Sequence, residues 1–292
     1  MVASGPDPAL AAAVVVFAHG ITANHKAWAL VTPRLDACVA TLAVDLRGRG
    51  GSVGLPGPYG MAAHADDIAS VLNYVGVDDC FIVGHSMGCF VASTFGVRFA
   101  DRLLGAVLVD GGVALRRPAD VDPANVVEAV IGPAMHRLRQ TFRSRADYQE
   151  VLASTLRSPA TASGTGQSPT TSITTWAAAS LVSRAGSTRL RSARMAQEVL
   201  LDPTVIDAAS FLECPTELIR VERGVLNEPT PLITAEVAAA LGHAERESIV
   251  TTAPGPQPLH DHADATGSGR RGGCNQPGVA TVDWHSVSPV PA

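Results

Sequence analysis

The chain has 292 residues, 46% of them hydrophobic and 17% charged, and a formal net charge of -5 at pH 7. This length and hydrophobic content suffice to bury the core of one large domain, with room for an insertion. The negative charge and the absence of a basic cluster argue against a nucleic-acid partner. The five cysteines, an odd number without CxxC spacing, favour neither a disulfide framework nor a zinc site, so we expect a reducing, cytoplasmic compartment and no metal.

The first third of the chain alternates between apolar runs rich in Val and Ile and stretches with helical spacing. The run at residues 9–18 is too short to span a bilayer and follows no basic residue, so it is interpreted as the entry to a buried strand and not as a membrane segment. This alternation predicts an α/β fold, a mostly parallel sheet with helices on both faces. The predicted strands are residues 13–18, 39–45, 81–83 and 104–110, and the predicted helices are residues 28–35, 62–75 and 87–99.

The alternation stops after Asp110, and we interpret residues 113–213 as an inserted helical lid. This segment has helix-like stretches, such as residues 125–151, but no convincing strand. Residues 157–187 and the tail at 253–292 are dominated by small and polar residues and predict irregular chain. Between them, the remaining predicted elements are a strand at residues 216–221, a helix at 234–241 and a strand at 247–251.

The stretch "FIVGHSMGC" contains the pattern G-x-S-x-G, with Gly84, His85, Ser86 and Gly88 between a predicted strand and a predicted helix. In a nucleophile elbow, a sharp strand-to-helix turn lifts the serine hydroxyl above the sheet edge, and flanking glycines remove side chains that would collide. The context here fits that motif, so Ser86 is the candidate nucleophile. For the bare five-residue pattern, the alternative is a chance match in a glycine-rich chain.

A serine nucleophile also needs hydrogen-bond donors for the developing oxyanion. The backbone N–H of Met87 lies at the predicted helix start, and the loop "FAHGIT" after the first predicted strand supplies a second candidate, the N–H of Ile21. We expect His19, which with Gly20 begins this loop, to shape it by hydrogen bonding. His19 is not the expected base, because it precedes the nucleophile at a strand end and does not follow the last strand.

At these residues the chain resembles the alpha/beta-hydrolase family. The motifs "HGIT", "DLRGRGGS", "GHSMG" and "LVDGG" stand in that family's order and spacing, and the resemblance covers a core at residues 13–112 and 214–252. It implies about eight strands in the complete fold, a helical cap after the sixth strand and a triad in the order serine, acid, histidine. It also implies that Asp45 and Arg47 brace a turn. Too few residues precede the first predicted strand for the hairpin that commonly opens this fold, and the hypothesis that follows is an incomplete amino-terminal end.

Two residues are candidates for the acid. Asp110 ends a predicted strand, the place from which some family members take the acid. Glu228 lies in "VERGVLNEP", where the family usually has an aspartate and this chain has Asn227. Each candidate also has a structural explanation, Asp110 as a capping residue before Gly111 and Glu228 as a solvated loop charge. We favour Asp110 and keep Glu228 as the alternative.

The base should follow the last predicted strand, where the tail offers His260 and His262. Neither is followed by an amphipathic helix that would hold the ring in place, and proton transfer requires hydrogen-bond reach to the hydroxyl. His260 is the better candidate because it lies nearer the strand end. The alternative hypothesis is that the tail at 253–292, and part of residues 157–187, are frameshifted readings, with an incomplete carboxyl-terminal end and no functional histidine.

The sequence therefore predicts a serine hydrolase that cleaves an ester or related acyl bond of a small molecule through an acyl-enzyme on Ser86. No cofactor, nucleic acid or membrane is expected to take part. The alternative is a catalytically silent or impaired ligand-binding protein of the same fold that lacks a proper catalytic histidine. The oligomeric state stays open.

Overall fold

The computed structural model describes residues 1–114, 185–221, 233–239 and 247–250, together with positions 125, 132, 143–144, 146–147 and 231. Most of the stretches predicted as helix-like at 125–151 and as irregular at 157–187, and the whole tail at 253–292, lie outside the described residues. Within the described ranges, no helix has the length and apolar character needed to cross a membrane.

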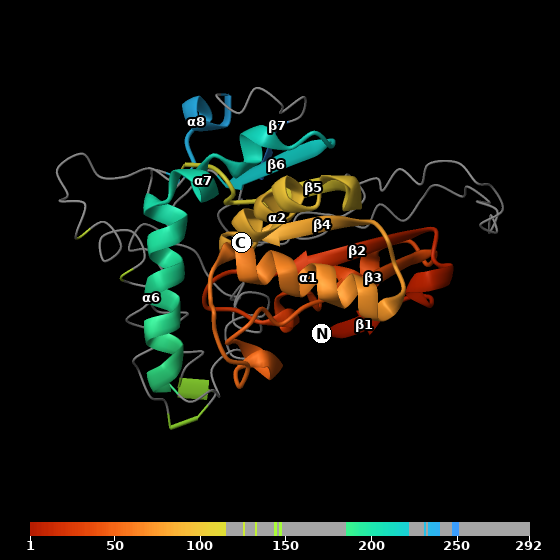
Figure 1. The fold of residues 1–292 in the computed structure, drawn as a ribbon, viewed down its shortest axis with the longest axis horizontal. Coiled ribbons are helices and arrows are strands. Elements are labelled where there is room, and N and C mark those ends of the chain that lie inside the picture. The colour runs from red at the N-terminus through yellow and green to blue at the C-terminus, as the bar shows by residue number, and fades with distance from the viewer. Residues whose placement is uncertain are drawn as a thin grey trace, which may run out of the picture.

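A seven-stranded sheet forms the centre of the molecule, in the order β1-β3-β2-β4-β5-β6-β7 (Figure 1). Strand β1 pairs antiparallel with β3, and all other neighbouring strands are parallel. Because parallel strands end at one edge of a sheet, the loops after β2, β4 and β5 meet there. The strands are β1 (Val2–Ser4), β2 (Ala13–Ala18), β3 (Val39–Ala43), β4 (Cys80–His85), β5 (Leu103–Val109), β6 (Thr216–Val221) and β7 (Glu247–Val250).

Alternate strand residues contribute to two hydrophobic clusters, one on each face of the sheet. On one face, Val16 and Ile82 belong to the cluster that packs under helices α1 (Met61–Val75) and α2 (Met87–Arg98). On the other face, Phe17 and Val83 belong to a smaller cluster that includes Trp28, and the rings of Phe17 and Trp28 lie 4.9 Å apart. The two-residue period of the strands thus supplies both layers of the core.

Helix α1 has the spacing of a helix that buries one face. Its buried residues Met61, Ala65, Ile68 and Leu72 recur every three or four positions. The helix ends at Gly76, which adopts a φ of 71° and donates its N–H back to the carbonyl of Leu72. Helix α2 is buried along most of its length, because it packs against the sheet on one side and α1 on another (Figure 1).

Helix α6 (Ala185–Leu201) stands at the end of the sheet where α1 begins (Figure 1). The carboxylate of Glu198 accepts a hydrogen bond of 2.9 Å from the N–H of Met61, the first residue of α1. A carboxylate at this position satisfies one of the unpaired N–H groups of a helix start and complements its partial positive charge. After α6, the chain forms α7 (Pro203–Ile206) and, further on, α8 (Ala235–Ala239).

The helical lid predicted at residues 113–213 stays a prediction, since most of its first two thirds lie outside the described residues. Within its last third, the segment at residues 203–211 packs against α2.

Short 3-10 helices complete the described elements. They are η1 (Pro8–Leu10), η2 (His25–Trp28), η3 (Thr32–Arg34), η4 (Gly50–Ser52), η5 (Ala100–Arg102) and η8 (Ala208–Phe211).

The structure confirms the predicted strands to within two residues at each end, and it confirms the predicted helices at 62–75 and 87–99 as α1 and α2. The helix predicted at residues 28–35 is wrong, because the chain forms η2 and η3 there and Pro33 cannot donate to a continuing helix. Strand β1 is not predicted from the sequence. It has three exposed residues at the sheet edge and so lacks an apolar signal. Helix α6 begins at Ala185, which lies within residues 157–187, a stretch predicted from its composition to be irregular chain.

The amino-terminal end of α2 lies so close to β2 that no side chain fits between them. A Cβ on Gly88 would collide with the carbonyl oxygen of Ala18 and stand 2.6 Å from its carbonyl carbon. A Cβ on Gly84 would stand 2.5 Å from the backbone nitrogen of Cys89. Since the opposing atoms belong to the backbone, they cannot move aside without shifting a strand or a helix.

We predict that Gly88→Ala lowers the free energy of unfolding by about 3 kcal/mol, because the added methyl group must displace the backbone of β2. Gly54→Ala is the control, since no atom lies within 4 Å of its Cβ position. That variant should stay within about 0.5 kcal/mol of the unmodified protein. Urea denaturation of the three proteins measures the difference, and equal midpoints for both variants would contradict the close approach.

Candidate active site

Ser86 lies at the turn between β4 and α2 in a strained backbone conformation, with φ 52° and ψ -117°. Its N–H donates to the carbonyl of Val109 at 2.8 Å, and its carbonyl accepts from the N–H of Cys89 at 3.0 Å. The turn is therefore held both by the neighbouring strand β5 and by the first turn of α2. A non-glycine residue at positive φ between a strand and a helix is the geometry of a nucleophile elbow.

Two further loops from the carboxyl edge of the sheet contact Ser86. A Cβ on Gly20, in the loop after β2, would stand 3.4 Å from the Cβ of Ser86 and 3.1 Å from Nδ1 of His85. A Cβ on Gly111, in the loop after β5, would stand 2.8 Å from the Cα of Ser86. The structure thus brings together the HGIT loop, the elbow and the loop of the LVDGG motif (the VDGG loop), which carry three of the four motifs singled out in the sequence.

Both ring nitrogens of His19 form hydrogen bonds with the backbone, one within its own loop and one with the loop after β3. Its Nδ1 lies 2.8 Å from the carbonyl oxygen of Gly20, and its Nε2 accepts a 3.1 Å hydrogen bond from the N–H of Leu46. This pattern requires the neutral tautomer with the proton on Nδ1. Burial lowers the pKa of His19 to about 3, which keeps the ring neutral near pH 7.

The peptide between Gly20 and Ile21 is held through its carbonyl. Besides His19, the N–H of Ala23 donates to the Gly20 oxygen at 3.1 Å. In a trans peptide the N–H points opposite to the carbonyl, so these bonds also fix the direction of the Ile21 N–H. The N–H groups of Ile21 and Met87 have no hydrogen-bond acceptor within the described ranges, which leaves both available to an oxyanion.

Asp110 follows β5 directly and has a positive φ of 51°. Its N–H donates to the carbonyl of Ile219 at 2.8 Å, which ties this loop to β6. Its Oδ1 is buried and has no hydrogen-bond partner among the described residues. Burial raises the pKa of the carboxyl to about 6, because the charged form loses solvation without gaining a partner. A buried, unpaired carboxylate oxygen beside the elbow is suited to accept a hydrogen bond from an imidazole.

Asp45 braces a turn, as the sequence predicts. It accepts hydrogen bonds of 2.8 Å from the N–H of His25 and of 2.8 Å from the N–H of Gly51, and its carboxylate also lies 2.9 Å from Nδ1 of His25. Burial alone would raise the pKa of Asp45, but these hydrogen bonds outweigh it and lower the pKa. The side chain of Arg47 donates hydrogen bonds to the carboxylate of Asp67 and to the carbonyl of Pro56, so Arg47 also has a structural role.

The remaining candidates fall outside the described residues, namely Glu228, His260 and His262. Of the described histidines, His25 pairs with Asp45 and His64 lies with Nε2 3.1 Å from Sδ of Met195. Burial lowers the pKa of His64 to about 3 and that of His85 to about 4. Within the described ranges, no histidine is hydrogen bonded to the hydroxyl of Ser86.

The sequence reasoning missed Arg49, whose side chain is only 3% exposed. It donates to the carbonyl of Ile21 and to side chains of α6. An arginine between two glycines of "RGRGG" has the pattern of an exposed loop residue, so nothing in the local sequence indicates burial. The partner segment on α6 lies more than a hundred residues away.

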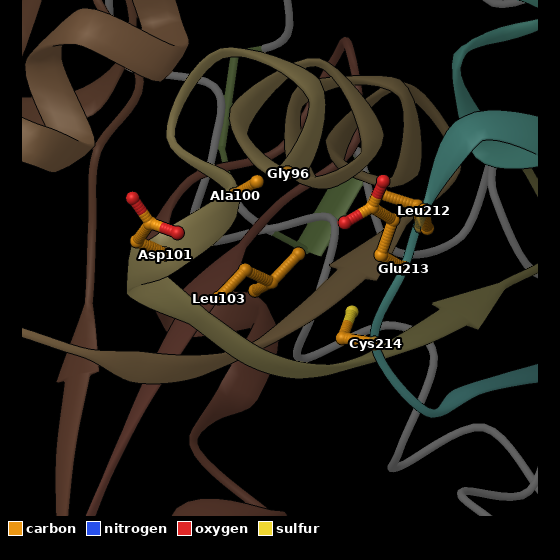
Figure 2. A pocket seen from close by; sticks show the side chains of 7 residues that line it. All are labelled: Gly96, Ala100, Asp101, Leu103, Leu212, Glu213 and Cys214. Atoms are coloured by element: carbon orange, nitrogen blue, oxygen red, sulfur yellow. The ribbon is translucent and has the colours of Figure 1, made fainter.

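A cavity of about 230 Å³ lies at the opposite edge of the sheet, where β5 and β6 begin. Figure 2 shows that Asp101 and Glu213 flank it from different elements. Because Ser86 lies at the carboxyl edge, this cavity is separate from the candidate active site. It is lined by Gly96, Ala100, Asp101, Leu103, Leu212, Glu213 and Cys214.

Comparisons with known proteins agree with this architecture. The chain is 32% identical to the 2-(acetamidomethylene)succinate hydrolase of Mesorhizobium japonicum over 97 residues, which are 33% of this chain and 35% of that protein. It is 36% identical to the N-formylmaleamate deformylase of Pseudomonas putida over 101 residues, 34% of this chain and 38% of that protein. The matched segments thus span little more than a third of the length of these curated relatives.

A solved structure of an E-2-(acetamidomethylene)succinate hydrolase superposes with a TM-score of 0.62 at 21% identity, covering 85% of this chain and 83% of that one. At this identity the similarity shows the fold alone. A family model for the alpha/beta hydrolase fold matches residues 13–226. Since this match spans well over half of the chain, the chain belongs to the alpha/beta hydrolase family.

Proposed function

We propose that this protein is a serine hydrolase that cleaves an ester or related acyl bond of a small molecule through an acyl-enzyme on Ser86. The observation that carries the proposal is the position of Ser86 on a strained elbow, with the HGIT and VDGG loops packed directly against it. A strained backbone conformation lowers the stability of the fold, and such conformations cluster at functional sites.

In this proposal the Oγ of Ser86 attacks the acyl carbon while a histidine base removes its proton. The N–H groups of Ile21 and Met87 stabilise the oxyanion, and the one on Met87 is aided by the partial positive charge at the start of α2. Collapse of the intermediate breaks the bond to the leaving group, which takes the proton from the histidine. Water then cleaves the acyl-enzyme and restores Ser86.

Asp110 is proposed as the acid that orients the histidine, and His260 as the base. Support for Asp110 comes from its place after β5, its buried oxygen without a described partner and its raised pKa. Glu228 is the alternative acid. His19 is proposed as a residue that shapes the oxyanion loop, because both of its ring nitrogens are engaged with backbone groups.

The proposed substrates are small molecules with a hydrolysable acyl group. Two curated relatives are named for hydrolysis of 2-(acetamidomethylene)succinate and for deformylation of N-formylmaleamate. Both names describe reactions of small molecules that carry an acyl group on nitrogen, which supports this substrate class for the present chain.

A second candidate is a catalytically silent ligand-binding protein of the same fold. Two observations favour it: the buried Oδ1 of Asp110 has no hydrogen-bond partner among the described residues, and no described histidine is hydrogen bonded to the hydroxyl of Ser86. If no histidine completes the site, the elbow would survive without an activated serine.

We predict that a fluorophosphonate adds one adduct to the intact protein, through a bond from the Oγ of Ser86 to phosphorus with loss of fluoride. Ser86→Ala should abolish the adduct. Ser70→Ala is the matched control, because Ser70 is an exposed serine on α1 whose hydroxyl donates to the carbonyl of Asp66. Intact-mass spectrometry reads out the result. No adduct on the unmodified, folded protein would favour the silent candidate.

We predict that Asp110→Asn slows acylation of Ser86 by roughly 10⁴-fold, since an amide cannot hold the histidine in the required tautomer. Asparagine tolerates positive φ, so the backbone at this position should be retained. Glu228→Gln, tested in parallel, should leave the rate within about twofold, because Glu228 takes no part in the proposed triad. A large loss in Glu228→Gln with none in Asp110→Asn would reverse the assignment of the acid.

The stability of Asp110→Asn should depend on pH. The pKa of Asp110 is raised from 3.8 to about 6 in the folded protein, so ionisation disfavours folding as pH rises through this window. Asparagine cannot ionise. Relative to the unmodified protein, the variant should therefore gain roughly 2 kcal/mol of unfolding free energy between pH 4 and pH 8. Denaturation at the two pH values measures this gain, and a pH-independent difference would refute the burial of charge at Asp110.

We predict that His260→Gln lowers the rate of Ser86 labelling by at least about 10³-fold, because the general base is lost. His262→Gln is the matched control two positions along the same tail and should label normally. Equal rates for both variants and the unmodified protein would remove His260 as the base.

A further inference from the structure

The side chain of Arg49 is buried between the HGIT loop and helix α6. Its Nε donates to the carbonyl oxygen of Ile21 at 2.7 Å. One terminal nitrogen donates to Sδ of Met195 at 3.3 Å, and the other lies 3.4 Å from Oγ of Ser192. A single guanidinium therefore joins the loop that carries the candidate oxyanion donor to a helix that follows far later in the chain.

We propose that Arg49 is a positioning residue that fixes the oxyanion-hole loop at Ile21 and couples that loop to helix α6. The assignment of a catalytic consequence rests on the proposed function, because the Ile21 N–H is a proposed oxyanion donor. That Arg49 and α6 hold the loop in place follows from the observed contacts and does not depend on the proposed function.

Both peptide groups of Ile21 are held in place. The carbonyl on its amino-terminal side, that of Gly20, accepts from His19 and from the N–H of Ala23. The carbonyl of Ile21 itself accepts from Arg49. With both neighbouring peptide planes pinned, the direction of the Ile21 N–H has little freedom. Preorganised donors of this kind stabilise an oxyanion without reorganisation during the reaction.

Helix α6 is held against this region by more than Arg49. Sδ of Met195 also lies 3.1 Å from Nε2 of His64, on α1. Glu198, three residues further along α6, accepts from the N–H of Met61. These contacts dock α6 on the start of α1 independently of Arg49. Helix α6 therefore keeps its position without Arg49, and the guanidinium holds the Ile21 loop against this helix.

The geometry requires an arginine. Guanidinium donors point in several fixed directions in one plane, so one side chain can serve Ile21, Ser192 and Met195 together. A lysine ammonium is a single point on a flexible stem and cannot reach three acceptors on different segments. Arg49→Lys keeps the charge and most of the apolar stem, and so separates the loss of positioning from the loss of charge.

The experiment compares Arg49→Lys, the double variant Ser192→Ala with Met195→Leu, and the control Arg102→Lys. Arg102 likewise donates to two backbone carbonyls, those of Asp78 at 2.6 Å and Val77 at 2.9 Å, but at the opposite edge of the sheet. Two measurements are made on each full-length protein. Hydrogen exchange of the fragment covering residues 19–24 reports on the loop, including the Ala23 amide that bonds to Gly20. The rate of Ser86 labelling by a fluorophosphonate, with kcat and KM for p-nitrophenyl acetate, reports on catalysis.

Arg49→Lys should raise the exchange rate of the loop fragment by at least about tenfold and slow labelling by about 10- to 100-fold, as for a displaced oxyanion donor. The loss should appear in kcat, with KM within about twofold, because transition-state contacts and not substrate binding are removed. The double variant should change both readouts in the same direction by a smaller factor. Arg102→Lys should change neither.

Unchanged loop exchange in Arg49→Lys would overturn the proposal, and so would an equal loss in Arg102→Lys. If Arg49→Lys does not fold, the double variant decides: faster loop exchange supports the coupling to α6, and unchanged exchange refutes it. If the unmodified protein is never labelled, the serine-hydrolase proposal fails, while loop exchange still tests the positioning by Arg49. The two failures are therefore distinguishable.

Discussion

The structure depends on a close approach of three backbone segments around Ser86. A Cβ on Gly88 or Gly111 would collide with the backbone of another segment, and a Cβ on Gly20 would be in tight contact with the side chain of His85. The segments can therefore meet this closely because glycine stands at these positions. Ser86 and Asp110 are the two non-glycine residues with positive φ in the described ranges, and each such conformation costs about 1–2 kcal/mol. Burial of the strands beneath α1 and α2 stabilises the fold enough to hold this strained edge in place.

Desolvation acts in opposite directions on the buried titratable groups at this edge. It lowers the pKa of His19, His64 and His85, so these rings are neutral near pH 7 and serve as hydrogen-bonding or packing groups. It raises the pKa of Asp110, whose carboxylate has no compensating partner among the described residues. Asp45, by contrast, gains enough hydrogen bonds from neighbouring backbone to stay charged. The same edge thus holds one satisfied carboxylate that braces a turn and one unsatisfied carboxylate beside the elbow.

Long-range polar contacts decide how helix α6 meets the carboxyl edge of the sheet. Glu198 caps α1, and Arg49 spans the space between Ile21 and α6. Each contact joins segments more than a hundred residues apart. The side chain of Glu198 stays 24% exposed, but Arg49 is only 3% exposed, so its charge lies where water is largely excluded. Buried charges of this kind are tolerated only when hydrogen bonds satisfy them, which makes the relative position of the loop and the helix specific.

The sequence by itself determined the parallel sheet, α1, α2 and the elbow at Ser86, because apolar periodicity and glycine spacing are local signals of strands, helices and sharp turns. It also identified the loops that meet at the carboxyl edge, whereas the role of Asp45 as a turn brace came from the resemblance to the hydrolase family. Only the tertiary structure decided that the 3-10 helices η2 and η3 replace the helix predicted at residues 28–35, that β1 adds an exposed edge strand, and that Arg49 is buried. These features depend on contacts between distant segments, and burial is a property of the assembled chain that local composition does not record.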